Sequence, residues 1–324
     1  MSKAVRIHET GGPEVLKWED VETEGPGPGE ALVRHAAVGL NYIDIYHRSG
    51  LYPLPALPAV IGMEGAGIVE AVSEGVEEVT VGDRVAYAAP PPGAYAEKRL
   101  ISADRLVAVP EGIDDVTAAA MMLKGMTAQY LLRRTHPVKS GETILVHAAA
   151  GGVGMILCQW ASHLGVRVIG TVGSEAKVEH AKTHGCDYAL LYDDGGYVNE
   201  IEVITEGRGV DVVYDGVGSE TFDSSLKSLS MLGHLVSFGQ TSGSVEPVEL
   251  GLLSAKSATL TRPVLFHYTE LRGDLVAAAN ELFDVVGRGV VRIEVSDTRP
   301  LADAAGAHRD LESRLTTGST VLIP

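Results

Sequence analysis

Short apolar runs separated by glycine and proline dominate the first third of the chain. Turns are expected between them at Gly25–Gly29, Val81–Asp83 and Pro90–Gly93. Runs of this length between turn residues are typical of antiparallel strands. The pattern predicts a barrel-like β domain, followed by two helices at Val116–Leu123 and Thr127–Arg134. Its predicted strands are Ala4–Ile7, Ala31–Val38, Gly67–Val72, Arg84–Tyr87 and Leu106–Val109.

From Thr143 onward the pattern changes to alternating strands and helices, which is typical of a doubly wound parallel sheet. After Pro263, the remaining elements are too few for a third domain, so we expect them to return to the N-terminal β domain. They are a helix over Asp274–Arg288, a strand over Val290–Val295, a helix near Leu301–Ser313 and a strand over Thr320–Ile323. The six predicted strands of the parallel sheet are Ile144–His147, Arg167–Val172, Tyr188–Leu191, Asp211–Tyr214, Leu235–Phe238 and Thr259–Arg262.

Length, charge and cysteine content narrow the class of protein. The 324 residues suffice for two domains, each of about 100–200 residues. A net charge of −17 repels polyanions, so we expect neither nucleic acid nor an anionic membrane as a partner. No run approaches a membrane span, and no apolar signal core opens the chain, so we expect a cytoplasmic protein. Cys158 and Cys186 lie in regular elements, where small core residues are expected.

A glycine-rich segment follows the first strand of the alternating region. The strand Ile144–His147 runs into Ala148–Gly154, and a helix with one apolar face follows. This order suits a dinucleotide fingerprint, although Ala149 stands where the first glycine is usual. Gly151 can let the backbone approach a pyrophosphate, and Gly154 lets the helix pack closely on the sheet. The free N–H groups of the helix N-terminus attract phosphate, so a dinucleotide site is predicted here.

The next strand indicates which dinucleotide is bound. It ends in Val172 and Gly173, without the acid that holds the ribose 2′-hydroxyl of NAD. Ser174, Lys177 and Tyr192 can instead surround a 2′-phosphate, with Lys177 supplying the charge. These residues favour NADPH, whereas Glu175 beside the turn is the residue that could favour NADH.

Several runs together resemble the zeta-crystallin-type quinone oxidoreductases, the zinc-free branch of the medium-chain dehydrogenase/reductase superfamily. The resemblance spans nearly the whole chain. It rests on Gly39–Tyr46, Arg48–Pro53, Gly82–Val85, Lys124–Thr127, His147–Gly154, Gly170–Gly173, Val213–Asp215, Val236–Gly239, Glu312–Arg314 and Leu322–Pro324.

The resemblance implies an α/β fold with a GroES-like, β-rich catalytic domain (residues 1–124 and 265–324) and a doubly wound Rossmann domain (residues 125–264). It also implies a homodimer. By position, Asn41, Tyr46 and Thr127 would surround the nicotinamide, with Phe238, Gly239 and Val264 on the nicotinamide side. Gly151, Gly152, Val153 and Gly154 would meet the pyrophosphate, and Gly173, Ser174, Lys177, Tyr192 and Arg314 would lie toward the adenosine phosphate.

Zinc-bearing relatives carry a Gly-His-Glu triplet, an earlier cysteine and a four-cysteine lobe. The corresponding positions here read Gly62-Met63-Glu64, Asn41 and Ala88–Tyr95. Zinc needs three or four cysteine, histidine or carboxylate ligands, so Glu64 alone is not a site and no metal is expected. Met63 also departs from close relatives, which often have a small polar residue there, and this leaves the pocket shape open.

Without a Lewis acid, oxidation of an alcohol at neutral pH is disfavoured, and an electron-poor acceptor fits better. Hydride transfer to a quinone leaves a phenolate-like anion, which resembles ionised tyrosine and forms far more readily than an alkoxide. We therefore predict an NADPH-dependent quinone reductase. Two alternatives remain, a reductase of α,β-unsaturated carbonyls and a non-catalytic NADPH-binding protein. Asn41 and Tyr46 either orient the acceptor or only hold the cofactor.

Overall fold

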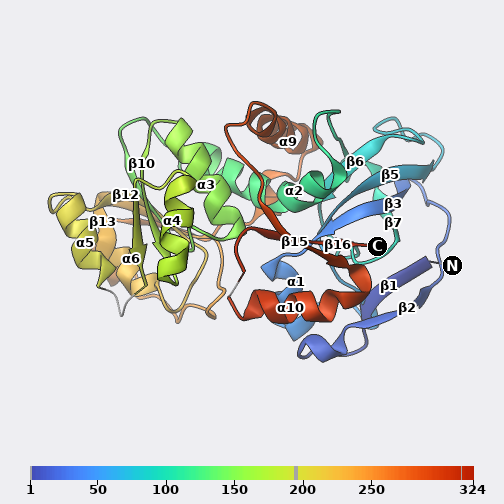
Figure 1. Ribbon diagram of the computed structural model, residues 1–324, viewed down its shortest axis with the longest axis horizontal. Helices are drawn as coiled ribbons and strands as arrows, with labels where there is room; N and C mark the ends of the chain where they lie inside the picture. Colours follow the sequence, from blue (N-terminus) through green and yellow to red (C-terminus); the bar gives the residue numbers. More distant parts are fainter. Residues whose placement is uncertain (1, 193–195, 315) are drawn as a thin grey trace. The chain divides into compact units, whose positions relative to one another are not determined.

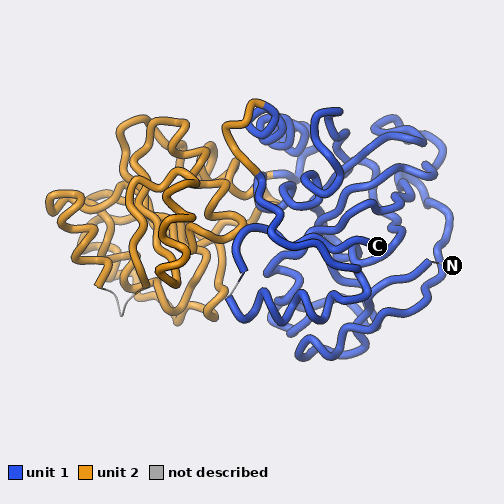
Figure 2. Tube along the Cα trace, viewed as in Figure 1, with its two compact units in different colours: residues 1–126, 269–287, 293–324 blue, residues 127–268, 288–292 orange. Residues whose placement is uncertain are grey.

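The computed structural model describes residues 2–192, 196–314 and 316–324. The chain forms two compact units (Figure 2). The first comprises Met1–Met126, Thr269–Gly287 and Ile293–Pro324, and the second comprises Thr127–Tyr268 and Arg288–Arg292. The domains predicted from the sequence were residues 1–124 with 265–324, and residues 125–264. The return of the C-terminal elements to the N-terminal unit makes the first unit discontinuous along the chain.

Two β-sheets form most of the first unit (Figure 1). In the described residues, the larger sheet has seven strands in the order β15-β16-β3-β5-β6-β8, with β7 also paired to β3, and the smaller has the order β2-β1-β4. Alternate residues of β3 are buried because they face a core that also contains Ile7, Tyr95 and Leu322. The strands are β1 (Ser2–Ile7), β2 (Lys17–Val21), β3 (Glu30–Gly39), β4 (Ala59–Val60), β5 (Glu64–Val72), β6 (Arg84–Ala88), β7 (Lys98–Ser102), β8 (Val107–Ala108), β15 (Val295–Pro300) and β16 (Ser319–Ile323).

The helices that accompany these sheets are α1 (Tyr42–Ser49), α2 (Asp115–Tyr130), α9 (Arg272–Gly287) and α10 (Ala304–Glu312). Helix α2 continues through Gly125, where the sequence pattern predicted a break between two helices. The glycine serves packing here, since a Cβ atom on it would lie 2.5 Å from the Leu282 side chain of α9. A π-helical turn over Leu131–Thr135 then ends the segment.

The second unit contains the predicted parallel sheet, in the strand order β11-β10-β9-β12-β13-β14. This is the order of a doubly wound Rossmann sheet, in which the direction of winding reverses between β9 and β12. The predicted α/β fold class and all six strands are confirmed. They are β9 (Thr143–Val146), β10 (Arg167–Val172), β11 (Tyr188–Leu191), β12 (Val210–Asp215), β13 (Leu229–Ser237) and β14 (Thr259–Thr261).

Helices pack on the strands of this sheet and on one another. α3 (Gly152–His163) and α4 (Glu175–Thr183) pack on β10, whereas α5 (Tyr197–Ile204) packs on α6 (Phe222–Ser228), which covers β12 and β13. α7 (Gly251–Ser254) and α8 (Leu265–Tyr268) are short. No helix in the described part of the chain is both long and apolar enough to cross a membrane.

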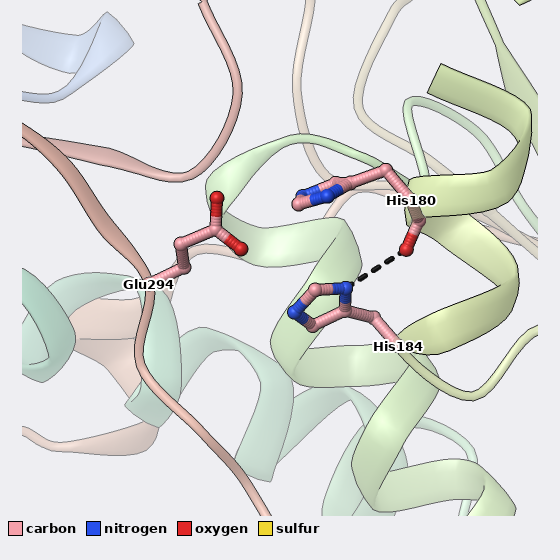
Figure 3. A group of neighbouring side chains, drawn as sticks. All are labelled: His180, His184 and Glu294. Carbon is pink, nitrogen blue, oxygen red and sulfur yellow. Dashed lines mark hydrogen bonds between the residues drawn. The ribbon is translucent and has the colours of Figure 1, made fainter. Parts of the chain in front are cut away.

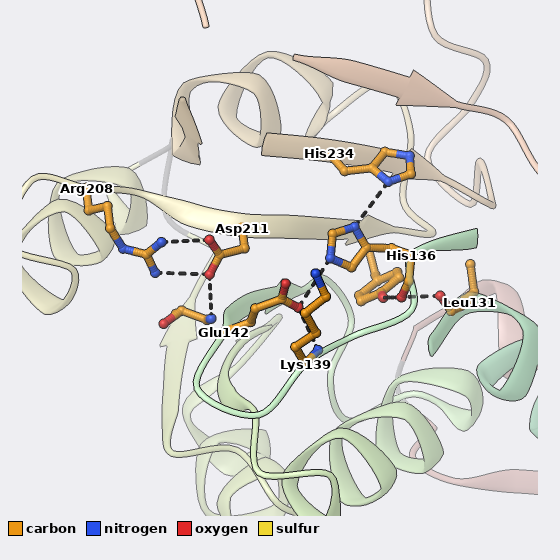
Figure 4. A network of polar contacts seen from close by, with 9 residues as sticks. Leu131, His136, Lys139, Glu142, Arg208, Asp211 and His234 are labelled. Carbon is orange, nitrogen blue, oxygen red and sulfur yellow. Dashed lines mark hydrogen bonds and ion pairs between the residues drawn. The ribbon is translucent and has the colours of Figure 1, made fainter. Parts of the chain in front are cut away.

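A polar network ties together the N-terminal ends of the parallel strands (Figure 4). The Asp211 carboxylate accepts the Thr143 N–H at 2.8 Å and forms an ion pair with Arg208 at 2.6 Å. Glu142 lies 3.3 Å from the His136 ring, which lies 3.4 Å from the ring of His234. These contacts lie at the end of the sheet where the strands begin. The loops that follow the strands lie at the opposite end.

One predicted strand was wrong. The apolar residues of Val290–Val295 indicated a strand there, but the strand begins at Val295 and runs through Ser296, Asp297, Thr298 and Arg299 to Pro300. Within the described part of the chain it pairs with β16 alone, and its positions alternate between half-buried and exposed, because one of its faces meets water. An edge strand tolerates such polar residues and proline, so its sequence lacks the apolar signal of a buried strand.

Candidate functional site

The glycine-rich loop joins β9 to α3 at the point where the winding of the parallel sheet reverses. Its first residue, Ala148, is left-handed with a φ of 52°. The Ala148 carbonyl accepts the Gly151 N–H at 2.8 Å, and the Ala149 N–H donates to the Thr171 carbonyl at 3.0 Å. A Cβ atom on Gly154 would collide with the Ala148 carbonyl oxygen, so only glycine allows this approach of helix and loop.

The sequence had indicated Ala149 as the departure from the fingerprint, but the left-handed residue is its neighbour Ala148. α3 begins with Gly152, Val153 and Gly154, whose N–H groups precede the first helical hydrogen bond, from Met155 to Gly151. Such N–H groups and the helix dipole hold phosphate oxygens. The loop therefore fits the pyrophosphate of a dinucleotide.

The end of β10 carries no acid, as the sequence indicated. Gly173 and Ser174 are exposed there, and Ser174 begins α4 with extended backbone angles. Apart from its two chain neighbours, no described residue has an atom within 4 Å of the place where a Cβ atom of Gly173 would be, so this position is open. Lys177 is half-buried one turn into α4, and burial lowers the pKa of its amine. A partly desolvated ammonium beside an open strand end suits a phosphate group.

Tyr192 directly follows β11, and its hydroxyl oxygen accepts the Ala148 N–H at 2.7 Å. Burial raises the pKa of Tyr192. Its hydroxyl is thus attached to the cofactor loop, whereas its predicted place near the adenosine phosphate stays a prediction. Phe238 directly follows β13, on the other side of the point where the winding of the parallel sheet reverses. Its N–H donates to the Asp215 carbonyl at 2.8 Å.

The remaining predicted residues of the second unit lie at separate points of it. Gly239 packs so closely on Gly216 that a Cβ atom would lie 2.5 Å from the Gly216 carbonyl oxygen. Val264 is 41% exposed just after β14, and Thr127 is buried in α2. Their predicted contacts with the nicotinamide stay predictions.

In the first unit, Asn41 caps α1 and is held by two acids. Its backbone N–H donates to the Asp44 carboxylate at 2.9 Å, and its amide nitrogen donates to Glu64 Oε2 at 2.7 Å. Asn41 is 4% exposed and both acids are fully buried. Burial raises the pKa of Asp44 to about 7. The Asn41 side chain therefore has a fixed orientation.

Glu64 has its own partners, which the sequence did not reveal. Its Oε1 accepts the Leu123 N–H at 2.8 Å, and the Lys124 ammonium lies 3.6 Å from its Oε2. That ammonium also donates to the Leu40 carbonyl at 3.1 Å. Burial is the main influence on the pKa of Glu64 and raises it, while Lys124 opposes the rise. Glu64, which stands at the position of the acid in the Gly-His-Glu triplet of zinc-bearing relatives, thus belongs to a buried ion pair.

Tyr46 lies on α1 within a group of aromatic side chains. Its ring is 5.1 Å from that of Tyr52, edge to face, and 6.3 Å from that of Tyr42. Tyr52 also donates its backbone N–H to the Tyr46 carbonyl at 3.0 Å. Arg314, the other predicted residue of this unit, is left-handed with a φ of 58° and acts electrostatically on Tyr42. The roles predicted for Asn41, Tyr46 and Arg314 stay predictions.

The metal-ligand positions of zinc-bearing relatives hold other side chains. Met63 is 1% exposed in the core, and Asn41 donates to Glu64. Figure 3 shows His180 on α4 and His184 just after it, where the His184 ring donates to the His180 carbonyl at 2.8 Å. Glu294, also drawn there, belongs to the other unit, so these three residues do not define a metal site within one unit.

Two family models match the chain. Residues 27–111 match the alcohol dehydrogenase GroES-like domain, and residues 152–282 match the zinc-binding dehydrogenase model. The first match confirms the predicted GroES-like domain. The second match does not include Asn41 or Met63, which lie outside its matched residues.

Similar proteins extend over the full length of the chain. A quinone oxidoreductase from Pseudomonas aeruginosa is 50% identical, with 100% of both chains covered. A 2-haloacrylate reductase from a Burkholderia species is 44% identical over 100% of this chain and 99% of its own. The crystal structure of the Escherichia coli quinone oxidoreductase complexed with NADPH has a TM-score of 0.97 and 45% identity, covering 99% of this chain and 100% of that one. The chain belongs to the zeta-crystallin-type quinone oxidoreductase family of the medium-chain dehydrogenase/reductase superfamily.

Proposed function

We propose that this chain is an enzyme that reduces quinones with NADPH and works without zinc. The observation that carries the proposal is the glycine-rich loop at the reversal point of the parallel sheet, beside a strand that ends without an acid. The names of the relatives from P. aeruginosa and E. coli support the quinone as acceptor, and the NADPH in the E. coli structure supports the cofactor.

The residues of the second unit have separate tasks in this proposal. The N–H groups of Gly152, Val153 and Gly154 bind the pyrophosphate, and Ser174 and Lys177 bind the 2′-phosphate, with Gly173 and Tyr192 nearby. Arg314, a residue of the first unit, keeps its proposed place toward the adenosine phosphate. Phe238, Gly239 and Val264 lie on the nicotinamide side. NADPH, when bound, supplies the hydride, and the chain's part is to place it and exclude water.

Asn41, Tyr46 and Thr127 would orient the acceptor and the nicotinamide. The Asn41 amide nitrogen donates to Glu64 Oε2 at 2.7 Å, and this hydrogen bond holds the side-chain amide in one orientation whether or not a ligand is bound. Orientation of the two reactants can supply most of the rate enhancement, because the reduced quinone leaves as a stable phenolate-like anion. The chain then needs neither a metal nor an obligatory acid side chain.

Reduction of an activated double bond is the second candidate. The observation that favours it is the 44% identity to a 2-haloacrylate reductase over the whole chain. The same hydride would add to the β-carbon of the double bond, and the negative charge would be held at the carbon next to the electron-withdrawing group. A proton must then be added to the neighbouring carbon, so proton donation by solvent or by a side chain matters more than in the reduction of a quinone.

Oxidation of NADPH with a panel of benzoquinones, enones and 2-haloacrylate decides between these functions. We expect the quinones to be turned over fastest, and the rate to be unchanged in a chelator because Asn41 and Met63 cannot replace the zinc ligands. Elemental analysis of the same preparation should find less than stoichiometric zinc. Turnover of the enones alone would favour the second candidate, and binding of NADPH without turnover would indicate a non-catalytic protein. One zinc per chain together with loss of activity in chelator would contradict the zinc-free mechanism.

We also propose a homodimer joined at the β14 edge of the parallel sheet. Among the residues that the structure describes, β14 pairs with β13 alone, so its other edge is not covered by a described strand and can offer N–H and C=O groups to a partner. Near it in sequence are the exposed apolar side chains Leu250 and Leu252, at 81% and 54% exposure. Analytical ultracentrifugation should give twice the 34.1 kDa of one chain. A charged residue in place of Leu250 should shift the protein toward the monomer, and a wild-type monomer at micromolar concentration would contradict the proposal.

A reducing compartment, the cytoplasm, is also proposed. The buried thiols Cys158 and Cys186 have their Sγ atoms 3.5 Å apart and are not bonded to each other. Neighbouring thiols stay reduced where glutathione and thioredoxin act. A small-molecule quinone or enone is the expected partner, and neither nucleic acid nor a membrane is.

A further inference from the structure

Helices α1 and α10 lie side by side in the first unit and are joined by a line of buried hydrogen bonds (Figure 1). Arg48 Nη1 donates to His308 Nδ1 at 3.0 Å, and His308 Nε2 lies 3.0 Å from the Tyr95 hydroxyl. That hydroxyl donates to Asp44 Oδ2 at 3.2 Å, and the same Oδ2 accepts the Asn41 N–H at 2.9 Å. None of these five residues is more than 4% exposed. The line, which we call the Arg48–Asp44 line, leaves α1 at Arg48 and returns to it at Asp44.

Arg48 fixes the direction of every hydrogen bond in this line, because a guanidinium can only donate. His308 Nδ1 therefore accepts from Arg48, and the neutral ring has its proton on Nε2, which donates to the Tyr95 oxygen. Tyr95 then donates its own proton to Asp44. Two pKa shifts agree with these directions. Burial and Arg48 lower the pKa of His308 to about 3, and burial and Asp44 raise the pKa of Tyr95.

The arginine at the start of the line is itself held on two sides. Its Nη1 and Nη2 donate to the two carboxylate oxygens of Glu312 on α10, at 3.0 and 2.6 Å, and its Nε donates to the Gly11 carbonyl at 3.1 Å. A planar guanidinium that pairs with both oxygens of a carboxylate has a defined orientation. Arg48 and Glu312 both belong to runs that carry the family resemblance, yet the proposed function gives neither of them a task.

Asp44 receives both of its hydrogen bonds on one oxygen. Asn41 and Tyr95 donate to Oδ2, whereas the buried Oδ1 has no hydrogen-bond partner among the described residues. Burial raises the pKa of Asp44 to about 7, against the effect of these two hydrogen bonds, and the charges of Glu64 and Lys124 act on it in opposite directions. A proton taken up by this carboxyl therefore resides on Oδ1. Oδ2 remains an acceptor for the Asn41 N–H in both protonation states.

Two acids hold Asn41 at two points. Asp44 accepts its backbone N–H, and Glu64 accepts its side-chain amide. We propose that Asp44 is a positioning residue for Asn41, and that the line from Arg48 keeps Asp44 Oδ2 aimed at the Asn41 N–H. The inference rests on the proposed function, in which Asn41 orients the acceptor and the nicotinamide. Without the line, the Asn41 backbone can shift while its side chain stays bound to Glu64, and the amide then tilts away from the reactants.

Steady-state kinetics with NADPH and a benzoquinone test the proposal in wild type, Tyr95→Phe and a matched control, Tyr87→Phe. Tyr87 is equally buried in the same core, but its hydroxyl lies 2.6 Å from His35 Nε2, outside the line. Loss of the Tyr95 hydroxyl should lower kcat by about 5- to 20-fold, because a small misplacement of an orienting group slows the reaction strongly. The dissociation constant of NADPH should stay nearly unchanged, because the glycine-rich loop and Lys177 lie in the second unit. An unchanged kcat in Tyr95→Phe, or an equal fall in both variants, would overturn the proposal.

Two replacements of Asp44 separate its hydrogen-bond acceptor from its negative charge. Asp44→Asn keeps a carbonyl oxygen that can take the place of Oδ2, whereas Asp44→Ala leaves the Asn41 N–H without an acceptor. We expect Asp44→Asn to retain most of kcat, and Asp44→Ala to lose at least as much as Tyr95→Phe. Circular dichroism checks that each variant is folded, and Tyr95→Phe with Asp44→Asn decides if Asp44→Ala is not. An Asp44→Asn variant slower than Tyr95→Phe would overturn the proposal, because the loss would then follow the charge.

A second measurement uses the cofactor-free protein and stays informative if the proposed function fails. The Asn41 amide should exchange with solvent faster in Asp44→Ala and Tyr95→Phe than in wild type or Tyr87→Phe. Nitrogen-15 spectra at neutral pH should show a neutral His308 ring with its proton on Nε2. Unchanged exchange at Asn41, or a His308 proton on Nδ1, would overturn the proposal. A wild-type protein that shows both signatures but turns over no quinone would contradict the proposed function alone.

Discussion

Lys177→Ala should weaken the binding of NADPH by about 10- to 150-fold and leave the binding of NADH nearly unchanged. The range corresponds to the roughly 1.5–3 kcal/mol that a hydrogen bond to a charged group contributes. The physical reason is the absence of an acid at the end of β10, which leaves the half-buried ammonium of Lys177 as the cation closest along the chain to the proposed 2′-phosphate site. Dissociation constants and kcat/KM for both dinucleotides provide the measurement.

Lys182 supplies the control, because it is an exposed lysine on the same helix. Lys182→Ala changes the net charge equally but should leave the preference for NADPH unchanged. An equal loss with NADPH and NADH in Lys177→Ala would show that this lysine supports the fold or the pyrophosphate instead of the 2′-phosphate. An equal response of both lysine variants would indicate only a long-range effect of charge.

Lys124→Met should destabilise the protein by about 3–5 kcal/mol at neutral pH, because removal of one partner leaves the other charge buried and uncompensated. The Lys124 ammonium lies 3.6 Å from a Glu64 carboxylate that is fully buried. Urea and thermal unfolding measure the loss. The matched control is Lys98→Met in the same unit, whose ion pair with Glu70 is partly exposed and should contribute less than about 1 kcal/mol.

The effect of Lys124→Met should depend on pH in a defined direction. Burial raises the pKa of Glu64 above its ordinary value of 4.5, and loss of the lysine raises it further. The folded state then holds a proton that the unfolded state releases, so stability falls as the pH rises from the ordinary value through the raised pKa. The destabilisation should shrink in mild acid. It should also be largely relieved at neutral pH in Lys124→Met/Glu64→Gln, and a pH-independent loss that the double variant retains would contradict the assignment.

Where the sequence carried a strong local signal, the fold could be predicted from it. The central strands of the parallel sheet are almost entirely buried and are therefore runs of valine, isoleucine and leucine, such as Ile144–Val146 and Val212–Val213. Helix α1 was missed because its tyrosines and isoleucines favour strands. Its signal was at its ends, where Asn41 and Asp44 form a capping box and Gly50 ends the helix with a φ of 84°.

The candidate site was less predictable, because its important contacts join residues far apart in the sequence. Glu64 could be recognised as a leftover acid, but its pairing with Lys124 depends on how β5 and α2 meet. The role of the Ala148 backbone depends in the same way on Tyr192, which follows a strand two places away in the sheet. A pattern along the chain indicates which residues are candidates for the site, and only the packing shows which atoms these residues contact.

Because the first unit is made of separate segments of the chain, it can be completed during synthesis only after its last segment has been made. The parallel sheet of the second unit is made from one continuous stretch and can fold as soon as residue 268 has left the ribosome. In the first unit, Val38 and Gly39 at the end of β3 pair with Leu322 and Val321 of β16. The strand that leads into Asn41 thus keeps an open edge until residues 319–323 are made. If the ribosome stalls before that point, this part of the β3 edge stays open, and an open strand edge is a template for pairing with another chain.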